Sequence, residues 1–319
     1  MSNNRIINIE KKYKIYIYGA GNMYNRLSDY LRFQRNRIIV LGIVTTTKLP
    51  YYTIDGYNCF SVNEVDLNEA DFVVVAIEKW EEIRDFLLKK GVLRKKIIRD
   101  KVFELPNFDI EEYVELINSR VTIFSNYCLG GMLYHELGLE ILSPTINMFC
   151  TGKDYLEFLE NYEYYLDCEM KELSSDCDRE LSQKIGEVYA SVPKGILGEK
   201  LVWVFNHDVD LSEAIVKWNI RKNRVNKQNV VAIMIIHSEE DAYQFEKLSI
   251  KRKIGIYYKD LHIKQVIYCP EWNDIQIRDR FGGSWHSYAN NYMLDTKGFA
   301  SPINWIKFLL GKEDYIRRI

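Results

Sequence analysis

The chain has 319 residues, a formal net charge of −2 and 47% hydrophobic residues. This length is sufficient for two domains that each bury a core without disulfides or metals. The charge balance does not predict a nucleic-acid-binding surface, so we expect no nucleic-acid partner.

The apolar segments are short and typical of buried strands. The longest, residues 72–77 and 230–236, fall well below the roughly 20 residues that a membrane-spanning helix requires. The N-terminal sequence MSNNRIINIEKKYK lacks the apolar stretch of a signal peptide. We therefore predict a cytoplasmic protein without an integral membrane segment.

The cysteines do not predict a disulfide framework or a metal centre. They show no C-x-x-C spacing and are scattered through both halves of the chain, as is typical of reduced thiols. We therefore predict no structural metal. The six cysteines are Cys59, Cys128, Cys150, Cys168, Cys177 and Cys269.

Residues 14–103 alternate strand-like and helix-like segments, which predicts a parallel sheet flanked by helices. The alternation stops at ELPNFD, where Pro106 ends regular structure and Asp109 can begin a capping box for a new helix. We place the domain boundary here, with a Rossmann-like domain at 1–108 and a second α/β domain at 109–319. The predicted fold class is α/β, with a mainly parallel sheet flanked by helices in each domain.

A glycine turn joins the first strand to the first helix in IYIYGAGNMYNRLSDYL. Gly19, Gly21 and Asn22 form the tight turn and helix start that a bound phosphate needs. Tyr24 replaces the third glycine of dinucleotide folds, and residues 45–47 are threonines where an acid would bind the ribose, so NAD binding is disfavoured. Two alternatives stay open: a nucleotide, nucleotide-sugar or coenzyme A phosphate over the loop, or a scaffold whose glycines only make the turn.

The second domain begins with the strand VTIFS, the glycine loop NYCLGG and a helix. In the loop, Gly130 and Gly131 can free backbone N–H groups to face an anion, with Asn126 as a polar contact. Cys128 lies at the predicted helix start, where a thiol pKa is lowered, and His135 follows about one turn later, so a cysteine nucleophile is also compatible. The alternative is a buried, inert cysteine.

The segment FNHDVD lies at the carboxyl end of a predicted strand, where open α/β sheets bind ligands. His207, Asp208 and Asp210 can supply a general base or a carboxylate pair for a divalent metal, of the D-x-D kind used with nucleotide diphosphates. Alternatively, Asp208 is a turn residue and Asp210 a helix N-cap. Downstream, Lys217 and Arg221 recur at helical spacing and can clamp a phosphate or carboxylate, or form a solvated basic face.

A glycine- and aromatic-rich segment, RFGGSWHSYANNY, lies towards the C-terminus. Its Trp285 and His286 are of the kind that stacks on sugar rings or closes a pocket. A packed loop is the alternative.

Three blocks of the sequence resemble one bacterial family and occur in the same order as in that family. The blocks are SNYCLGGMLYHELGL…SPTINMF, VPKGILGEKLVWVFNH and EAIVKWNIRKNRVNKQN. That family is a domain of unknown function labelled exopolysaccharide biosynthesis protein and found beside capsule and exopolysaccharide genes. The first domain resembles the small Rossmann-like modules of bacterial surface-polysaccharide proteins. The family-pattern positions are Asn126, Cys128, Gly130, Gly131, Ser143, Pro144, Asn147, His207, Lys217, Trp218, Arg221, Arg224 and Asn226.

The resemblance implies surface-polysaccharide biosynthesis, by a transferase or modifying enzyme that acts on a nucleotide-activated or lipid-linked sugar. The catalytic candidates are His207, Asp208 and Cys128. The ligand-binding candidates are Gly19, Gly21, Asn22, Asn126, Gly130, Gly131, Lys217 and Arg221. A non-catalytic nucleotide-sugar or polysaccharide binding or scaffold protein is the alternative. The expected partner is a sugar nucleotide or saccharide, the cofactor is unassigned, and the sequence is compatible with a homo-oligomer.

Overall fold

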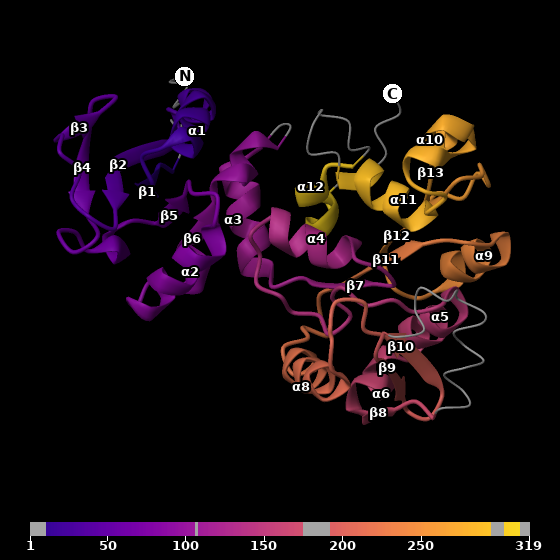
Figure 1. Cartoon of the computed structure of the whole chain (residues 1–319). Coiled ribbons are helices and arrows are strands. Elements are labelled where there is room, and N and C mark those ends of the chain that lie inside the picture. The colour runs from indigo at the N-terminus through magenta and orange to yellow at the C-terminus, as the bar shows by residue number, and fades with distance from the viewer. Residues whose placement is uncertain (1–10, 106–107, 175–191, 295–302, 313–319) are drawn as a thin grey trace, which may run out of the picture. The chain divides into compact units, whose positions relative to one another are not determined.

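The computed structural model describes residues 11–105, 108–174, 192–294 and 303–312 (Figure 1). The chain divides into two compact units. Unit 1 comprises Met1–Val114 and Glu136–Leu139, and unit 2 comprises Glu115–His135 and Glu140–Ile319. The fold class is α/β with parallel-rich sheets flanked by helices, as the sequence predicted.

The division between the units is more complex than one cut between residues 108 and 109. The helix α3 (Ile110–Ser119) runs from unit 1 into unit 2, and Asp109 caps it by accepting the N–H groups of Glu111 and Glu112 at 2.9 and 3.0 Å. The segment 136–139 returns to unit 1, because Tyr113 Oη donates a hydrogen bond to Leu137 O at 2.7 Å. Pro106 lies outside the described residues.

Unit 1 contains a six-stranded sheet in the order β3-β4-β2-β1-β5-β6, with parallel pairing except between β3 and β4. Its strands are β1 (Tyr13–Tyr18), β2 (Ile38–Thr45), β3 (Thr53–Ile54), β4 (Tyr57–Ser61), β5 (Phe72–Val75) and β6 (Ile97–Arg99). Its helices are α1 (Asn22–Phe33), α2 (Trp80–Lys89) and the short 3₁₀ helices η1 (Leu67–Glu69), η2 (Arg94–Lys96) and η3 (Asp100–Glu104). All four side chains of β5 are buried, as expected of a central parallel strand covered on both faces.

Unit 2 contains a parallel sheet in the order β13-β12-β11-β7 (Figure 1). Its strands are β7 (Thr122–Ser125), β11 (Val230–Ile235), β12 (Arg252–Tyr257) and β13 (Val266–Tyr268). A second, antiparallel sheet consists of β8 (Met170–Glu172), β9 (Lys194–Leu197) and β10 (Leu201–Val204). Since β7, β11 and β12 are parallel neighbours, the residues that follow them emerge at one edge of the sheet.

The helices of unit 2 follow the strands in the chain. They are α4 (Leu129–Glu136), α5 (Gly152–Glu160), α6 (Tyr162–Asp167), α8 (Leu211–Lys222), α9 (Glu239–Lys247), η5 (Pro270–Asn273), α10 (Ile275–Arg280), α11 (Trp285–Leu294) and α12 (Trp305–Leu310). Five of them begin with a side-chain N-cap, from Thr151, Asp210, Ser238, Asp274 and Asn304.

The core of unit 2 is rich in aromatic side chains around Trp203 of β10. The Trp203 ring lies 5.4 Å from that of Phe158 and 5.8 Å from that of Trp218, and all three side chains are almost fully buried. Burial of each large apolar side chain contributes about 1.5–3 kcal/mol. A backbone pair between Phe149 and Val204 adds hydrogen bonds of 2.8 and 2.9 Å. These contacts fix the chain that continues into FNHDVD.

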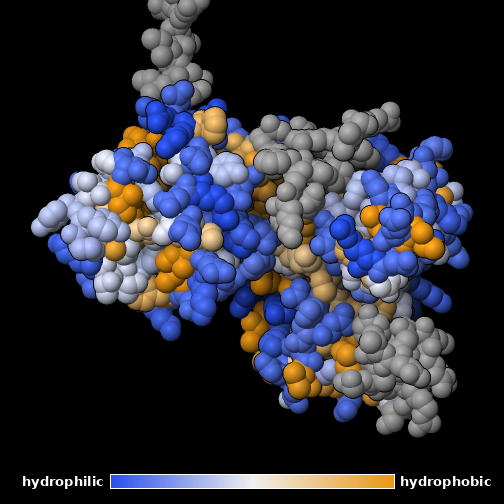
Figure 2. All heavy atoms as spheres, turned by 45° about the horizontal axis from the view of Figure 1, so that its top comes forward, coloured by the Kyte–Doolittle hydropathy of each residue, from blue (hydrophilic) through white to orange (hydrophobic). Residues whose placement is uncertain are grey.

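The surface is predominantly hydrophilic. On the face seen in Figure 2, hydrophobic residues form separate areas among hydrophilic ones. Within the described ranges, every helix is too short or too polar to cross a lipid bilayer.

Candidate functional site

The glycine turn of unit 1 follows β1. The structure requires a glycine at one of its two glycine positions but not at the other. Gly19 has φ +118°, and a Cβ there would lie 2.5 Å from Ala76 O, so only glycine fits. Gly21 is the N-cap of α1, and a Cβ there would meet no atom within 4 Å. Asn22 is exposed at the start of α1. The fold therefore requires Gly19, whereas phosphate binding over Gly21 and Asn22 stays a prediction.

Two pairs of side chains around the glycine turn and the end of β2 form hydrogen bonds. Tyr24, at the third glycine position of the dinucleotide pattern, donates from its hydroxyl to Asp55 Oδ2 at 2.9 Å. The hydroxyls of Tyr18 and Thr46 lie 2.7 Å apart. These contacts engage Tyr24 and Thr46 within the protein, and the disfavoured binding of NAD stays a prediction.

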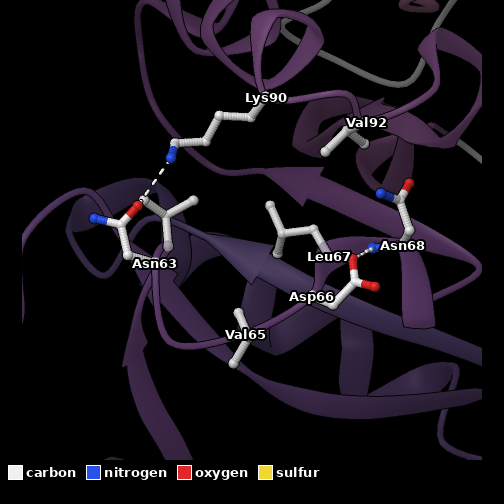
Figure 3. Close-up of a pocket in the computed structure, with 8 residues that line it drawn as sticks. Asn63, Val65, Asp66, Leu67, Asn68, Lys90 and Val92 are labelled. Carbon is white, nitrogen blue, oxygen red and sulfur yellow. Dashed lines mark hydrogen bonds between the residues drawn. The ribbon is translucent and has the colours of Figure 1, made fainter.

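Unit 1 also contains a cavity of about 400 Å³ that the sequence did not indicate (Figure 3). It is lined by residues 62, 63 and 65–68, which follow β4, and by Lys90 and Val92 beyond α2. Lys90 Nζ donates to Asn63 Oδ1 at 2.8 Å, so its ammonium group is already paired with a lining amide. The cavity is separate from the glycine turn, because its lining includes neither Gly19 nor Gly21.

In unit 2, Cys128 and His207 meet although 79 positions separate them in the chain. Cys128 lies just beyond β7, and the chain after β10 carries His207 to it. The distance from Cys128 Sγ to His207 Nε2 is 3.3 Å, which is a hydrogen-bonding distance for sulfur. His135, the alternative base, is exposed on α4. The geometry therefore pairs two of the three predicted catalytic residues.

The environment of the thiol differs from the expected one. Cys128 is half-buried, and burial raises the pKa of its thiol above the ordinary value, whereas the predicted position at a helix start implied a lowered pKa. The thiol is therefore protonated at neutral pH. Such a nucleophile needs an adjacent general base, and His207 Nε2 is placed to accept the thiol proton.

Gly130 and Gly131 do not form the predicted loop, because both lie inside α4 and are buried. A Cβ on Gly131 would lie 2.2 Å from Asn147 Oδ1, and a Cβ on Gly130 would lie 2.9 Å from Ser125 Cβ. The two glycines thus let α4 pack closely on its neighbours. Close packing therefore explains why both residues are glycines, without a bound anion.

Asn126, predicted to contact a ligand, is fully buried. Its side-chain amide donates to Ile235 O at 3.0 Å, and its Oδ1 accepts the N–H of Ile235 at 2.9 Å. These two hydrogen bonds tie the residue after β7 to the last residue of β11. Asn126 therefore aligns the carboxyl ends of two strands.

The predicted acidic and basic residues after His207 pair with one another. Lys217 Nζ lies 2.7 Å from Asp208 Oδ1 and 2.9 Å from Glu213 Oε1, and the Asp208 side chain is only 12% exposed. Burial lowers the pKa of Arg221, and the carboxylate of Asp208 opposes that shift. Asp210 caps α8 by accepting the N–H of Glu213 at 2.9 Å. Asp208 and Lys217 are therefore engaged within the protein before any ligand binds.

Sequence reasoning missed Tyr127 and His237 and left the role of His286 open. Tyr127 Oη lies 3.0 Å from His237 Nε2, and the Tyr127 ring stacks on the His286 ring at 4.8 Å and 14°. Trp285 is buried, and its Nε1–H donates to Ile236 O at 2.8 Å, so it is a packing residue. Tyr127 and His237 each follow a predicted apolar strand, and that position was the available signal.

Metal and disulfide sites are absent from the part of the chain that the structure describes. No group of three or more His, Cys, Asp or Glu side chains there is arranged to hold a metal ion. The described cysteines are free thiols, and Cys177 lies outside the described residues.

Two family descriptions match successive parts of the chain. Residues 11–98 match "C2185-like, N-terminal", and residues 99–317 match "Domain of unknown function (DUF1919)". Among curated proteins, the chain is similar to a Haemophilus influenzae protein described as uncharacterized, with 26% identity over 148 residues. That match covers 46% of this chain and spans 65% of the length of the relative.

Likeness to solved structures is low. Aspartate semialdehyde dehydrogenase II from Vibrio cholerae aligns with a TM-score of 0.24 and 9% identity, over 77% of this chain and 82% of that one. A meso-DAPDH mutant from Clostridium tetani aligns with a TM-score of 0.23 and 10% identity, over 73% and 74% of the two chains. These values carry no functional argument.

Proposed function

Because the chain belongs to the family described as domain of unknown function DUF1919, whose description assigns no reaction, we propose a function from the geometry of unit 2. The protein is a cysteine-dependent transferase that moves an acyl group from an activated donor to a saccharide hydroxyl in surface-polysaccharide biosynthesis. The observation that carries the proposal is the 3.3 Å distance between Cys128 Sγ and His207 Nε2 beyond the carboxyl end of β7. The polysaccharide setting and the cytoplasmic location are supported only by the sequence.

The geometry suits a reaction in two halves. His207 Nε2 accepts the thiol proton of Cys128, and the sulfur attacks the acyl carbonyl carbon of the donor. The bond from that carbon to the leaving group breaks, and His207 returns the proton to the leaving group. A saccharide hydroxyl then attacks the thioester, the C–S bond breaks, and the hydroxyl proton passes through His207 to the sulfur. Atoms and charge balance without a metal or redox cofactor.

Cys128 and His207 act as a dyad. Among the residues that the structure describes, the His207 ring has Cys128 as its hydrogen-bonding partner and contacts no carboxylate. Asp208, the third catalytic candidate, pairs with Lys217 at 2.7 Å. In this proposal Asp208 and Lys217 therefore fix the chain between His207 and α8, and the proton moves only between Cys128 and His207.

A non-catalytic saccharide-binding or scaffold protein is the second candidate. It is favoured by the raised pKa of Cys128 and by the pairing of Asp208 with Lys217, since both are compatible with a site that performs no chemistry. In such a protein the Cys128–His207 contact would only join two loops. The two candidates differ in whether the thiol is acylated.

The test uses p-nitrophenyl acetate as a small activated acyl donor. We expect a burst of p-nitrophenolate and one acetyl group on Cys128 by mass spectrometry. Cys128→Ser should lower the acylation rate by about 10³-fold or more, and His207→Ala by about 10²-fold or more. Cys168→Ser, at another half-buried free thiol, is the matched control and should acylate like the wild type.

Two results would reject the transferase proposal. The first is a wild-type protein that carries no acetyl group on Cys128 after reaction. The second is a Cys128→Ser variant with the wild-type burst, which would assign the acylation to another residue. Either result would favour the binding or scaffold function.

A further inference from the structure

Tyr127, His237 and His286 form a cluster of three rings, called the ring cluster below, and Tyr127 directly precedes Cys128 in the chain. The Tyr127 and His237 ring centroids are 5.6 Å apart, and His286 stacks on Tyr127. Ser284 Oγ lies 3.2 Å from His286 Nε2 and 3.3 Å from its Nδ1. The reaction halves described above do not use this cluster.

The fold holds the ring cluster from both sides. Asn126, which ties β7 to Ile235 of β11, directly precedes Tyr127, so Tyr127 and His237 leave adjacent strand ends. Trp285 donates its indole N–H to Ile236 O at 2.8 Å, which fixes the start of α11 and therefore the neighbouring His286. A cluster anchored by three buried hydrogen bonds is preorganised before any ligand arrives.

The surroundings of the two imidazoles in the ring cluster favour their neutral form. His237 keeps an exposed surface, but the protein packed around it and the neighbouring His286 lower its pKa to about 4. Burial also lowers the pKa of His286. A neutral imidazole both donates and accepts a hydrogen bond, as does a sugar hydroxyl, and the flat rings offer apolar contact. The cluster is therefore suited to an uncharged, hydroxyl-rich ring and is poorly suited to a phosphate.

The ring cluster and the thiol belong to one short segment. Asn126, Tyr127 and Cys128 are consecutive, so the ring cluster and the thiol both follow the carboxyl end of β7. His237 is exposed, and His286 is half-buried, so a ligand can reach both rings from solvent.

We propose that the ring cluster is the acceptor subsite, where His237 hydrogen-bonds the attacking hydroxyl of a neutral sugar ring and directs it to the thioester on Cys128. This inference rests on the proposed acyl transfer and adds the class of acceptor. His237 positions the hydroxyl oxygen, and His207 still moves the proton. The bond changes are those of the second half-reaction: C–O forms, C–S breaks, and the hydroxyl proton reaches the sulfur through His207.

The experiment separates the two half-reactions. The acetyl-enzyme is made with p-nitrophenyl acetate, and its loss is followed by mass spectrometry in buffer alone and with methyl glycosides of glucose, galactose, mannose and N-acetylglucosamine. At least one glycoside should accelerate the loss and become acetylated. In His237→Asn the glycoside-dependent rate should fall about tenfold, as expected for one lost hydrogen bond, while the first burst is unchanged. Tyr127→Phe, which keeps the ring and removes the partner hydroxyl of His237, should give a smaller decrease.

The control is His262→Asn, the same substitution at an exposed histidine that hydrogen-bonds Asp260 outside the cluster. It should leave both half-reactions unchanged. If the acetyl-enzyme forms but no glycoside accelerates its loss, or if His237→Asn keeps the full glycoside-dependent rate, the acceptor subsite is rejected and the acyl transfer stands. If no acetyl-enzyme forms, the proposed function itself fails.

Discussion

The glycine turn after β1 in unit 1 and Cys128 after β7 in unit 2 both lie beyond the carboxyl end of a parallel strand, whereas His207, the partner of Cys128, follows the antiparallel strand β10. Different forces keep the residues at the two places. Gly19 is required by its positive φ and by its contact with Ala76 O. The backbone conformation at Cys128 does not require a thiol next to an imidazole in the way that the backbone at Gly19 requires a glycine. The fold alone therefore explains Gly19 of the recognisable glycine motif. The Cys128–His207 pair belongs to no such motif, yet it gives the stronger functional argument.

The largest effect is expected when one methyl group is added at each glycine of the turn. Gly19→Ala should destabilise unit 1 by about 3 kcal/mol, because a Cβ would meet a backbone oxygen at 2.5 Å in a left-handed conformation. Gly21→Ala should cost less than about 1 kcal/mol, the loss of a moderately good N-cap. Urea unfolding measures both values. Equal losses would contradict the assignment of Gly19 to structure and Gly21 to open space.

The second prediction concerns the two asparagines that the sequence assigned to ligands. Asn126→Leu should destabilise unit 2 by about 2 kcal/mol, because it leaves the buried N–H and C=O groups of Ile235 unpaired. Asn22→Leu, at an exposed helix start, should change stability by less than about 0.5 kcal/mol. Chemical unfolding provides the comparison. A stable Asn126→Leu protein would show that the strand-end hydrogen bonds are dispensable.

A third prediction tests whether the glycine turn still binds a ligand. A sugar nucleotide or coenzyme A at ten times its dissociation constant would stabilise unit 1 by about 1.4 kcal/mol, which a thermal-shift panel detects. Gly21→Val should remove the shift by covering the start of α1, and NAD should give none. If no compound shifts the melting temperature, the turn is a scaffold. A shift that survives Gly21→Val would place the ligand elsewhere.

The last prediction concerns the pH response of the ring cluster. His237 should titrate near pH 4 in NMR spectra, below the ordinary value of about 6.5. Because its pKa is lower in the folded state, the unfolded state binds the proton first as the pH falls. The free energy of unfolding should therefore decrease from about pH 6.5 to pH 4, and less so in His237→Asn. An ordinary titration would show that His237 is not held in the crowded cluster described here.

The local elements of the fold were readable from the sequence. The alternation of apolar and helical segments predicted the α/β class, because hydrophobic periodicity and caps are properties of neighbouring residues. Asp109 and Asp210 cap their helices where the sequence placed them. The prediction that Gly130 and Gly131 form a loop was wrong. Both glycines lie in α4, where their small size allows close contact with Ser125 and Asn147, and such contacts between segments cannot be read from the local sequence.

What the sequence by itself determined is therefore the fold class, the helix caps at Asp109 and Asp210, and the strand ends at which chemistry was expected. Only the tertiary structure decided that His207 approaches Cys128 and that Tyr127 meets His237 and His286. The physical reason is that hydrophobic patterns act over a few residues. Side-chain convergence depends instead on strand order and register, which are set by packing between segments about 80 to 160 positions apart.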